Sequence, residues 1–276
     1  MERSFSELAY LQAFHGGVPI LAAGDIFDKW NAPLEVVNWA LDVLPTMYAI
    51  PGNHDLPSHR PELSHRSAYG TLVRAGKLLE LGPQPTRVYG EDAFALVLYG
   101  RPFGGDVPRA RTTGRDLHVL LTHEYLWDIP SNSYHGADEE RRLDKVARRW
   151  AGFDVVVVGD NHMGFLRKVH GGTNVLNCGT FFRRKTSEAE YAPSVGLIHR
   201  SGKVSTHLLD ISQDVLTRAT PEQEAMDETG NEIALLVEEL GRLEASSTNF
   251  RDEVRRALDS KRASQAVREV LTEAME

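Results

Sequence analysis

The feature that most constrains this fold is a set of four apolar segments that each end in polar residues. They are VPILAAGDIFD (18–28), TMYAIPGNHD (46–55), LHVLLTHE (117–124) and VVVVGDNH (155–162). A short aliphatic run bounded by glycine, proline or an acid is typical of a buried β-strand. Four buried strands that each deliver an acid, an amide or an imidazole at the same end indicate one shared site rather than four unrelated turns.

Amphipathic segments separate these strands and predict a layered α/β domain. Helices are expected over 4–14, 33–44 and 137–150, and a helix followed by a short strand is expected over 67–81. Pro33 lies where the first turn of a helix tolerates proline. Further strands are predicted at 93–100, 173–180 and 194–200. In an open α/β sheet, the carboxyl ends of the strands form the ligand crevice.

The pattern changes after about residue 211, which predicts two domains: an α/β domain over 1–210 and an acidic helical extension over 211–276. The net charge is −8 at pH 7, and residues 211–276 carry 8 basic and 15 acidic side chains, so the α/β domain is nearly neutral. Apolar stripes at 233–243, 250–258 and 267–271 predict amphipathic helices. Such helices pack on their own domain or on a partner.

The composition excludes several classes of protein. The single cysteine, Cys178, excludes an internal disulfide framework and fits the reducing cytoplasm. No apolar run approaches the roughly 20 residues that a membrane helix needs, so no membrane contact is expected. Acids interrupt the apolar residues of the N-terminal segment, which is not typical of a signal peptide. We therefore expect a cytoplasmic protein.

The strand ends present ligands for a divalent cation. Oxygen and nitrogen donors without thiolate suit Mn, Fe or Zn. Buried carboxylates and imidazoles would otherwise stay unsatisfied or repel one another. Each fragment alone also has a plain interpretation: GDxxD as a capping turn, NHD as an Asx-turn, and a strand-end histidine as a core residue. Their common placement favours a metal site.

GDIFD, PGNHD, the isolated THE and the late GDNH resemble the motifs of the calcineurin-like metallophosphoesterase family, over roughly residues 4–210. The sequence is most similar to the DNA-repair exonuclease branch and to related bacteriophage phosphoesterases, and NCGTFFRR (177–184) resembles a segment of that branch. The resemblance implies a two-sheet sandwich flanked by helices, with two divalent ions, of which Mn is expected. It also implies hydrolysis of phosphodiester bonds by a metal-activated water, with DNA as the expected substrate.

The resemblance implies a metal-binding role for five residues. Asp25 would bridge both ions, Asn53 and His123 would bind the second ion, and His162 would bind the first. The last motif of the family is usually Gly-His-x-His. Asp160 stands in place of its first histidine, and a carboxylate can also bind a cation there.

The resemblance also implies roles for residues around the phosphate. His54 would stabilise charge on the scissile phosphate or protonate the leaving oxygen, Asp55 would orient His54, and Asp28 would be a supporting acid. Arg183 and Arg184 could hold phosphate, and the competing interpretation is an exposed basic loop. In this family a histidine after Gly-Asn accompanies diesterase activity, but it does not name the substrate.

The family begins with a strand that carries Asp-x-His, and no such motif precedes Asp25. Three interpretations stay open: a start assigned too far downstream, which is favoured, a single metal at the second site, or a non-catalytic member. In the repair branch, C-terminal helices bind an ATPase with a long coiled coil, so the extension implies such a partner. The alternative function is an interaction protein that acts through this helical tail.

Overall fold

The computed structural model describes residues 2–91, 94–110, 115–134, 137–183, 188 and 190–214. Contacts divide the chain into one unit of Met1–Arg183 with Glu190–Asp214 and a second unit of Arg184–Ala189 with Val215–Glu276. The fold below is that of the first unit. The predicted helical tail, on which the ATPase partner depends, lies outside the described residues. In the part of the chain that is described, no helix is long and apolar enough to cross a bilayer.

A parallel three-stranded sheet with three helices forms the N-terminal half of this unit. Its strands are β1 (Ile20–Ala22), β2 (Met47–Ala49) and β3 (Leu78–Glu80), and its helices are α1 (Glu2–Phe14), α2 (Leu34–Val43) and α3 (Ala68–Arg74). Ser67 caps α3 by accepting a hydrogen bond from the Gly70 amide at 3.1 Å. Apolar residues of α2 and α3 bury the outer face of this sheet. These elements confirm the helices and strands predicted over residues 4–81.

A six-stranded mixed sheet forms the second half. Its strands are β4 (Thr86–Glu91), β5 (Phe94–Arg101), β6 (Leu117–His123), β7 (Val155–Gly159), β8 (Phe165–Lys168) and β9 (Asn174–Asn177). The order is β4-β5-β6-β7-β9-β8, in which the four inner strands run parallel and each edge strand is antiparallel to its neighbour. Every residue of β6 is buried, as expected for a central strand that is covered on both faces.

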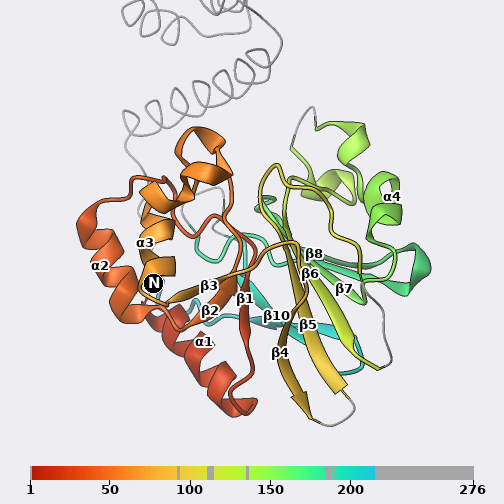
Figure 1. Cartoon of the computed structure of the whole chain (residues 1–276), viewed down its shortest axis with the longest axis horizontal. Helices are drawn as coiled ribbons and strands as arrows, with labels where there is room; N and C mark the ends of the chain where they lie inside the picture. Colours follow the sequence, from red (N-terminus) through yellow and green to blue (C-terminus); the bar gives the residue numbers. More distant parts are fainter. Residues whose placement is uncertain are drawn as a thin grey trace, which may run out of the picture. The chain divides into compact units, whose positions relative to one another are not determined.

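The two sheets pack face to face and share a core. Leu121 and Val157 of the six-stranded sheet meet Ile50 next to β2. On the opposite face, Trp150 of the short helix η5 (Ala147–Trp150) shares a core with Leu120 and with Leu143 of α4 (Leu143–Val146). Figure 1 shows α1, α2 and α3 outside the three-stranded sheet and α4 outside the six-stranded sheet. The predicted two-sheet α/β sandwich flanked by helices is confirmed.

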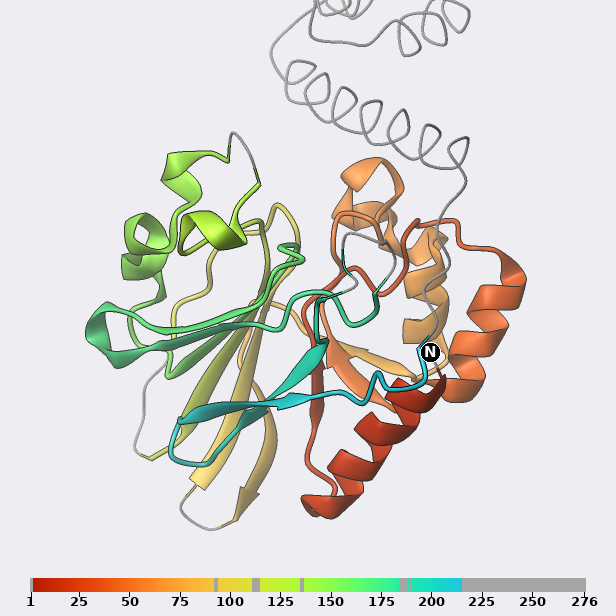
Figure 2. The same ribbon diagram turned by 180° about the vertical axis from the view of Figure 1, so that it is seen from behind.

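A C-terminal hairpin of β10 (Ser194–Ile198) and β11 (Val204–Leu208) completes the described fold. Val204 joins the core between the sheets. The end of the hairpin and the chain that follows it reach α1, as Figure 2 shows in blue and red. The Glu7 carboxylate of α1 accepts hydrogen bonds from His207 Nε2 of β11 at 2.9 Å and from the Asp210 amide beyond it at 3.0 Å. The first helix is thereby tied to the end of the domain.

The single helix predicted over 137–150 is wrong. The segment breaks into η4 (Glu139–Arg141), α4 and η5, with Arg142 in an extended conformation between the first two. At this break the Leu143 amide donates to the Trp127 carbonyl at 2.8 Å, and Trp127 pairs with Arg142 as in a parallel bridge. A long-range backbone pairing therefore overrides the helical propensity of the segment.

The sequence pattern also missed β4, β8 and β11. In β8 only Phe165 is buried while Leu166, Arg167 and Lys168 are exposed, so the strand lacks the alternation that marks a half-buried strand. Its pairing with β9 at the edge of the sheet makes it a strand. Short 3₁₀ helices occupy connections: η1 (Pro57–His59), η2 (Pro61–Arg66), η3 (Pro130–Asn132) and η6 (His170–Gly172).

Candidate metal centre

Four strand ends from the two sheets converge on one place. Asp25 follows β1, Asn53 follows β2, His123 is the last residue of β6, and Asp160 follows β7. Among the described residues, Asp25, His123 and Asp160 form a group whose ligand atoms all lie within 4.8 Å of one another. Since these residues are far apart in sequence, the face-to-face packing of the sheets creates the group.

His123 lies at the centre of this group and is buried. Its Nδ1 lies 2.7 Å from the carbonyl oxygen of Ala23, so Nδ1 must carry a proton and donate it. Its Nε2 lies 3.0 Å from Asn53 Oδ1 and 3.4 Å from Asp25 Oδ2. A neutral imidazole would therefore direct a lone pair at two oxygen acceptors.

This geometry fits a divalent cation. His123 Nε2, Asn53 Oδ1 and Asp25 Oδ2 converge, and all three are acceptors when the imidazole is neutral. A proton on Nε2 or a bound cation would stabilise this arrangement. The donor set is two carboxylates, an amide oxygen and an imidazole, which suits Mn, Fe or Zn. Asp25, His123, Asp160 and Asn53 are the residues that would hold the ion.

The charges around His123 favour the same interpretation. Burial alone lowers the pKa of the His123 imidazole, but the hydrogen bond and negative charge of Asp25, together with the charge of Asp160, raise this pKa to about 9. Burial alone raises the pKa of the Asp25 carboxyl, but the hydrogen bond and charge of His123 outweigh it and lower this pKa. The site therefore stabilises positive charge, as a cation-binding site must.

Both carboxylates of the group sit on left-handed backbone. Asp25 has φ 53° and Asp160 has φ 85°. Left-handed conformations are uncommon for residues other than glycine, although aspartate tolerates them better than most, and each costs on the order of 1–3 kcal/mol. Such strain persists where the surrounding structure fixes the backbone, and it concentrates at functional sites.

Glycine is required where the backbones approach the ligands. A Cβ atom on Gly52 would lie 2.0 Å from Asp25 Oδ1. A Cβ atom on Gly159 would lie 2.0 Å from the Ala23 carbonyl and 2.7 Å from His123 Nδ1. The glycines of the PGN and GDN motifs therefore make room for the ligands of neighbouring strands.

Asp55 is fully buried and holds two site loops together. Its carboxylate accepts hydrogen bonds from the amides of Gly52 at 3.0 Å, Phe27 at 3.1 Å and Ile26 at 3.2 Å. Burial and the charge of Asp25 raise the pKa of Asp55 to about 6, against the lowering effect of these amides. Asp55 thus clamps the loops after β1 and β2 together, and its expected role in orienting His54 stays a prediction.

His54 is exposed, and its main-chain amide and its ring are each held by a hydrogen bond. Its amide donates to Asp25 Oδ1 at 3.1 Å, and its ring Nδ1 lies 2.8 Å from the carbonyl oxygen of Asp28. The carbonyl of Asp28 therefore contacts the ring, and the role of Asp28 as a supporting acid stays a prediction. The expected role of His54 at the phosphate stays a prediction.

The GDNH segment divides its polar side chains between two directions. Asp160 joins the metal group, but His162 is exposed and lies outside it. Asn161 is buried, and its amide nitrogen donates to the carbonyls of Leu126 at 2.7 Å and Asn132 at 2.8 Å. Asn161 is a structural clamp, while the assignment of His162 as a ligand of the first ion stays a prediction.

The arginines expected to hold phosphate have different outcomes. The Arg183 side chain is largely buried and forms an ion pair with Asp214 at 3.1 Å, so the exposed-loop interpretation does not apply to it. Arg184 lies outside the described residues. Phosphate binding by either arginine stays a prediction.

Sequence reasoning missed Glu124, which follows His123 directly. Its two carboxylate oxygens form ion pairs with Arg101 at 2.8 Å and with Arg149 at 2.6 Å. Arg101 also donates to the hydroxyl of Thr122 at 3.0 Å, so the end of β6 is fixed on both sides of the histidine. The acid of the THE motif was a signal that the sequence offered for this role. Its partners Arg101 and Arg149 are distant in sequence, so the ion pairs could not be predicted from it.

Comparison with solved structures yields remote likenesses. The protein TT1561 of Thermus thermophilus is 14% identical, with a TM-score of 0.46 over 75% of this chain and 93% of its own. A second solved structure is also 14% identical, with a TM-score of 0.35 over 76% of this chain and 84% of its own. Likenesses this remote carry no information about activity. No curated protein matches the sequence.

The comparison with family models is decisive. The model of the calcineurin-like phosphoesterases matches residues 8–164, which is more than half of the chain. This range includes the four strand ends and every residue of the metal group. Members of this family hydrolyse phosphoesters with divalent metal ions, and the match does not distinguish its branches. The chain belongs to the calcineurin-like phosphoesterase family.

Proposed function

We propose that this protein is a Mn-dependent phosphodiesterase that cleaves DNA. Membership of the family shows a metal-dependent phosphoester hydrolase. The proposal adds that the metal is Mn, that the bond cleaved is a phosphodiester and that the substrate is DNA. The observation that carries it is the convergence of Asp25, Asn53, His123 and Asp160, which offer only oxygen and nitrogen ligands. This chemistry suits Mn, and the histidine after Gly-Asn supports a diester substrate.

The residues around the ion divide the work of hydrolysis. A bound divalent ion would neutralise charge on the phosphate and make a water molecule more acidic. Asp25 and His123 would hold that ion, and Asp55 keeps the two loops in register. His54 is exposed, and its amide is anchored on Asp25, so its ring is available to protonate the leaving oxygen.

The first experiment is equilibrium dialysis against Mn²⁺ with elemental analysis, followed by hydrolysis of bis(p-nitrophenyl) phosphate and of DNA. We expect His123→Ala to abolish metal binding and hydrolysis. The exposed His199 hydrogen-bonds Ser205 next to β10, so His199→Ala is the matched control and should change neither. A folded protein that binds no Mn²⁺, or binds it and cleaves no diester, would overturn the proposal.

A second candidate is a single-ion site, which the composition of the metal group supports. Within the described residues, the metal group contains Asp25, His123 and Asp160 but not His162. About one ion per chain in the dialysis would support this candidate, and about two would support a site that also uses His162. DNA cleavage distinguishes a nuclease from a phosphoesterase of small molecules.

The cellular context follows from sequence pattern alone. We propose the cytoplasm as the location, because one cysteine suits a reducing compartment. A coiled-coil ATPase is the proposed partner of residues 211–276. Co-purification with and without this segment tests that partner directly.

A further inference from the structure

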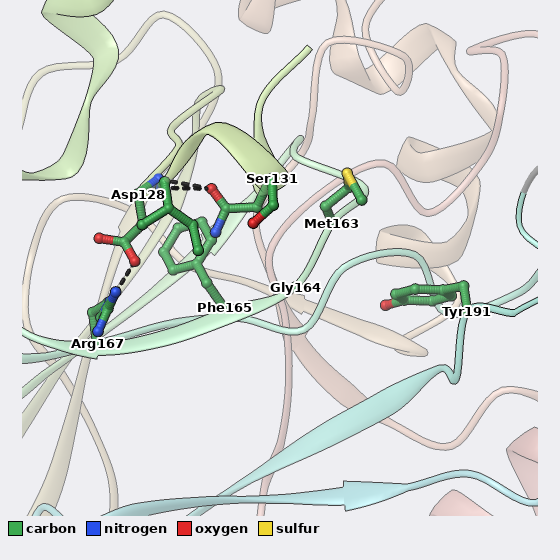
Figure 3. A pocket seen from close by; sticks show the side chains of 9 residues that line it. Asp128, Ser131, Met163, Gly164, Phe165, Arg167 and Tyr191 are labelled. Carbon is green, nitrogen blue, oxygen red and sulfur yellow. Dashed lines mark hydrogen bonds and ion pairs between the residues drawn. The ribbon is translucent and has the colours of Figure 1, made fainter.

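A pocket of about 360 Å³ opens between two segments that flank the metal-binding loop after β7. One wall is the turn of residues 128–132, the other is residues 163–167, which lead into and begin β8, and Tyr191 completes the lining. Figure 3 shows Asp128, Ser131, Met163, Phe165 and Arg167 around it. None of the lining residues is a ligand of the metal group.

Asn161 fixes this pocket relative to the metal centre. It directly follows Asp160, and it ties the turn to the metal-binding loop through its hydrogen bonds to the carbonyls of Leu126 and Asn132. Its side-chain oxygen accepts from the amide of Met163 at 2.9 Å. One buried side chain therefore joins both walls of the pocket to the segment that carries a metal ligand.

The turn that forms the first wall is rigid. The side-chain oxygen of Asn132 accepts from the amides of Asp128 at 2.9 Å and Ile129 at 3.0 Å. On the other wall, a Cβ atom on Gly164 would lie 3.1 Å from the Cys178 carbonyl, so this segment is pressed against the chain that follows β9. Walls held in this way present a preformed site rather than one made by rearrangement.

The walls combine apolar faces with a polar edge. Ile129 is 42% exposed and Met163 is 48% exposed, so both apolar side chains are accessible to a ligand. Phe165 is buried beneath them. At one end Arg167 forms an ion pair with Asp128, so hydrogen-bond donors and acceptors lie side by side. A planar group with an apolar face and a hydrogen-bonding edge matches this lining.

We propose that this pocket binds the nucleobase adjacent to the phosphate that is cleaved. The inference rests on the proposed function, which it deepens by naming the part of the substrate that is recognised. The volume suits a heterocycle with its sugar, Ile129 and Met163 would pack on the ring, and the Arg167–Asp128 pair would face its edge. Every base presents an apolar face against which Ile129 and Met163 could pack, so one pocket serves a chain of mixed sequence.

The test is calorimetric binding of dAMP and of deoxyribose phosphate to the full chain, with and without Mn²⁺. Both ligands carry the phosphate, and only dAMP carries the base. We expect dAMP to bind about tenfold more tightly than deoxyribose phosphate in both conditions, because the base would bury apolar surface against Ile129 and Met163. Met163→Ala and Ile129→Ala should each remove most of this difference.

Leu166→Ala is the matched control. Leu166 is as exposed as the pocket residues at 39%, but it lies between Phe165 and Arg167 on β8 and points to the other side of the strand. It should retain the full preference for dAMP. Thermal unfolding of the three variants verifies that each is folded, which is expected because all three side chains are partly exposed.

Two outcomes separate this inference from the proposed function. Equal binding of dAMP and deoxyribose phosphate, with hydrolysis of bis(p-nitrophenyl) phosphate intact, would overturn the pocket and leave the phosphodiesterase. A preference for dAMP that Met163→Ala and Ile129→Ala leave unchanged would also overturn it. Base-dependent binding that these variants remove, in a protein that cleaves no diester, would support the pocket and overturn the phosphodiesterase.

Discussion

The two sheets hold their halves of the metal centre by different means. On the six-stranded side, β6 is buried along its whole length and His123 is part of the strand itself. On the three-stranded side, the strands are three residues long, and Asp25 and Asn53 lie on loops. There the buried carboxylate of Asp55 holds these loops in place by accepting three backbone hydrogen bonds. Apolar burial of a whole strand, supported by the ion pairs of Glu124, positions His123, and a buried polar clamp positions the loops of the other half.

Removing the polar clamp should give the largest effect on both stability and metal binding. Asp55→Ala leaves three amides without their acceptor, so we expect the free energy of unfolding to fall by about 3–4 kcal/mol at pH 7.5 and Mn²⁺ affinity to fall at least about tenfold. Urea denaturation and dialysis measure these two effects. Asp138→Ala removes an exposed cap that binds the Glu140 amide, and this control should cost about 1 kcal/mol or less. A loss below about 1 kcal/mol for Asp55→Ala would show that the clamp is dispensable.

The corresponding change on the other sheet is Leu121→Ala. Leu121 is fully buried in the core between the sheets, so the cavity should lower the free energy of unfolding by about 3 kcal/mol. Since burial along the rest of β6 persists, the affinity of the folded protein for Mn²⁺ should change less than about threefold. If Leu121→Ala and Asp55→Ala reduce the affinity equally, the two halves of the site do not differ in the way proposed here.

The dependence of metal binding on pH sharpens the comparison at His123. Its pKa is about 9 without an ion, and a metal binds only the form with Nε2 unprotonated. The apparent affinity for Mn²⁺ should therefore fall about tenfold for each pH unit below 9 and level off above it. Asp25 adds no slope near neutral pH, because its lowered pKa keeps it ionised. Titrations between pH 7 and 10 would contradict the assignment if the affinity were constant.

The smallest expected effect concerns the helical layer outside the three-stranded sheet. The Oγ of Ser67 caps α3 by accepting a hydrogen bond from the Gly70 amide. Ser67→Ala removes this cap and should lower the free energy of unfolding by about 1 kcal/mol. Metal affinity should not change, because α3 contributes no ligand. Ser67→Asp keeps an acceptor and should restore most of the stability. A change in metal binding would show that the outer helices also position the site.

Sequence pattern predicted most of the elements that carry the site. The apolar runs before Asp25, Asn53, His123 and Asp160 are strands or end in strands, and three of these residues form the metal group. The pattern could not assign Asp55, because its partners Ile26 and Phe27 lie on another loop. It also grouped Asn161 with its neighbours, although the side chain points away to Leu126 and Asn132.

The helix predicted over 137–150 shows that long-range contacts also limit the prediction of secondary structure. Its charged residues at helical spacing suit a helix, but pairing of Arg142 with Trp127 divides it. Propensity describes a segment in isolation, and a backbone pairing to a distant residue supplies free energy that the segment alone does not reveal.

The sequence by itself determined which residue types stand at the ends of the buried strands, because hydrophobic periodicity and turn chemistry are local. Only the tertiary structure decided which of those side chains meet. His123 contacts the Ala23 carbonyl and Asn53 only because two sheets pack face to face, and the buried Asn161 and Asp55 are satisfied only by backbone groups of other loops. Such contacts depend on packing between residues distant in the chain, which no local pattern encodes.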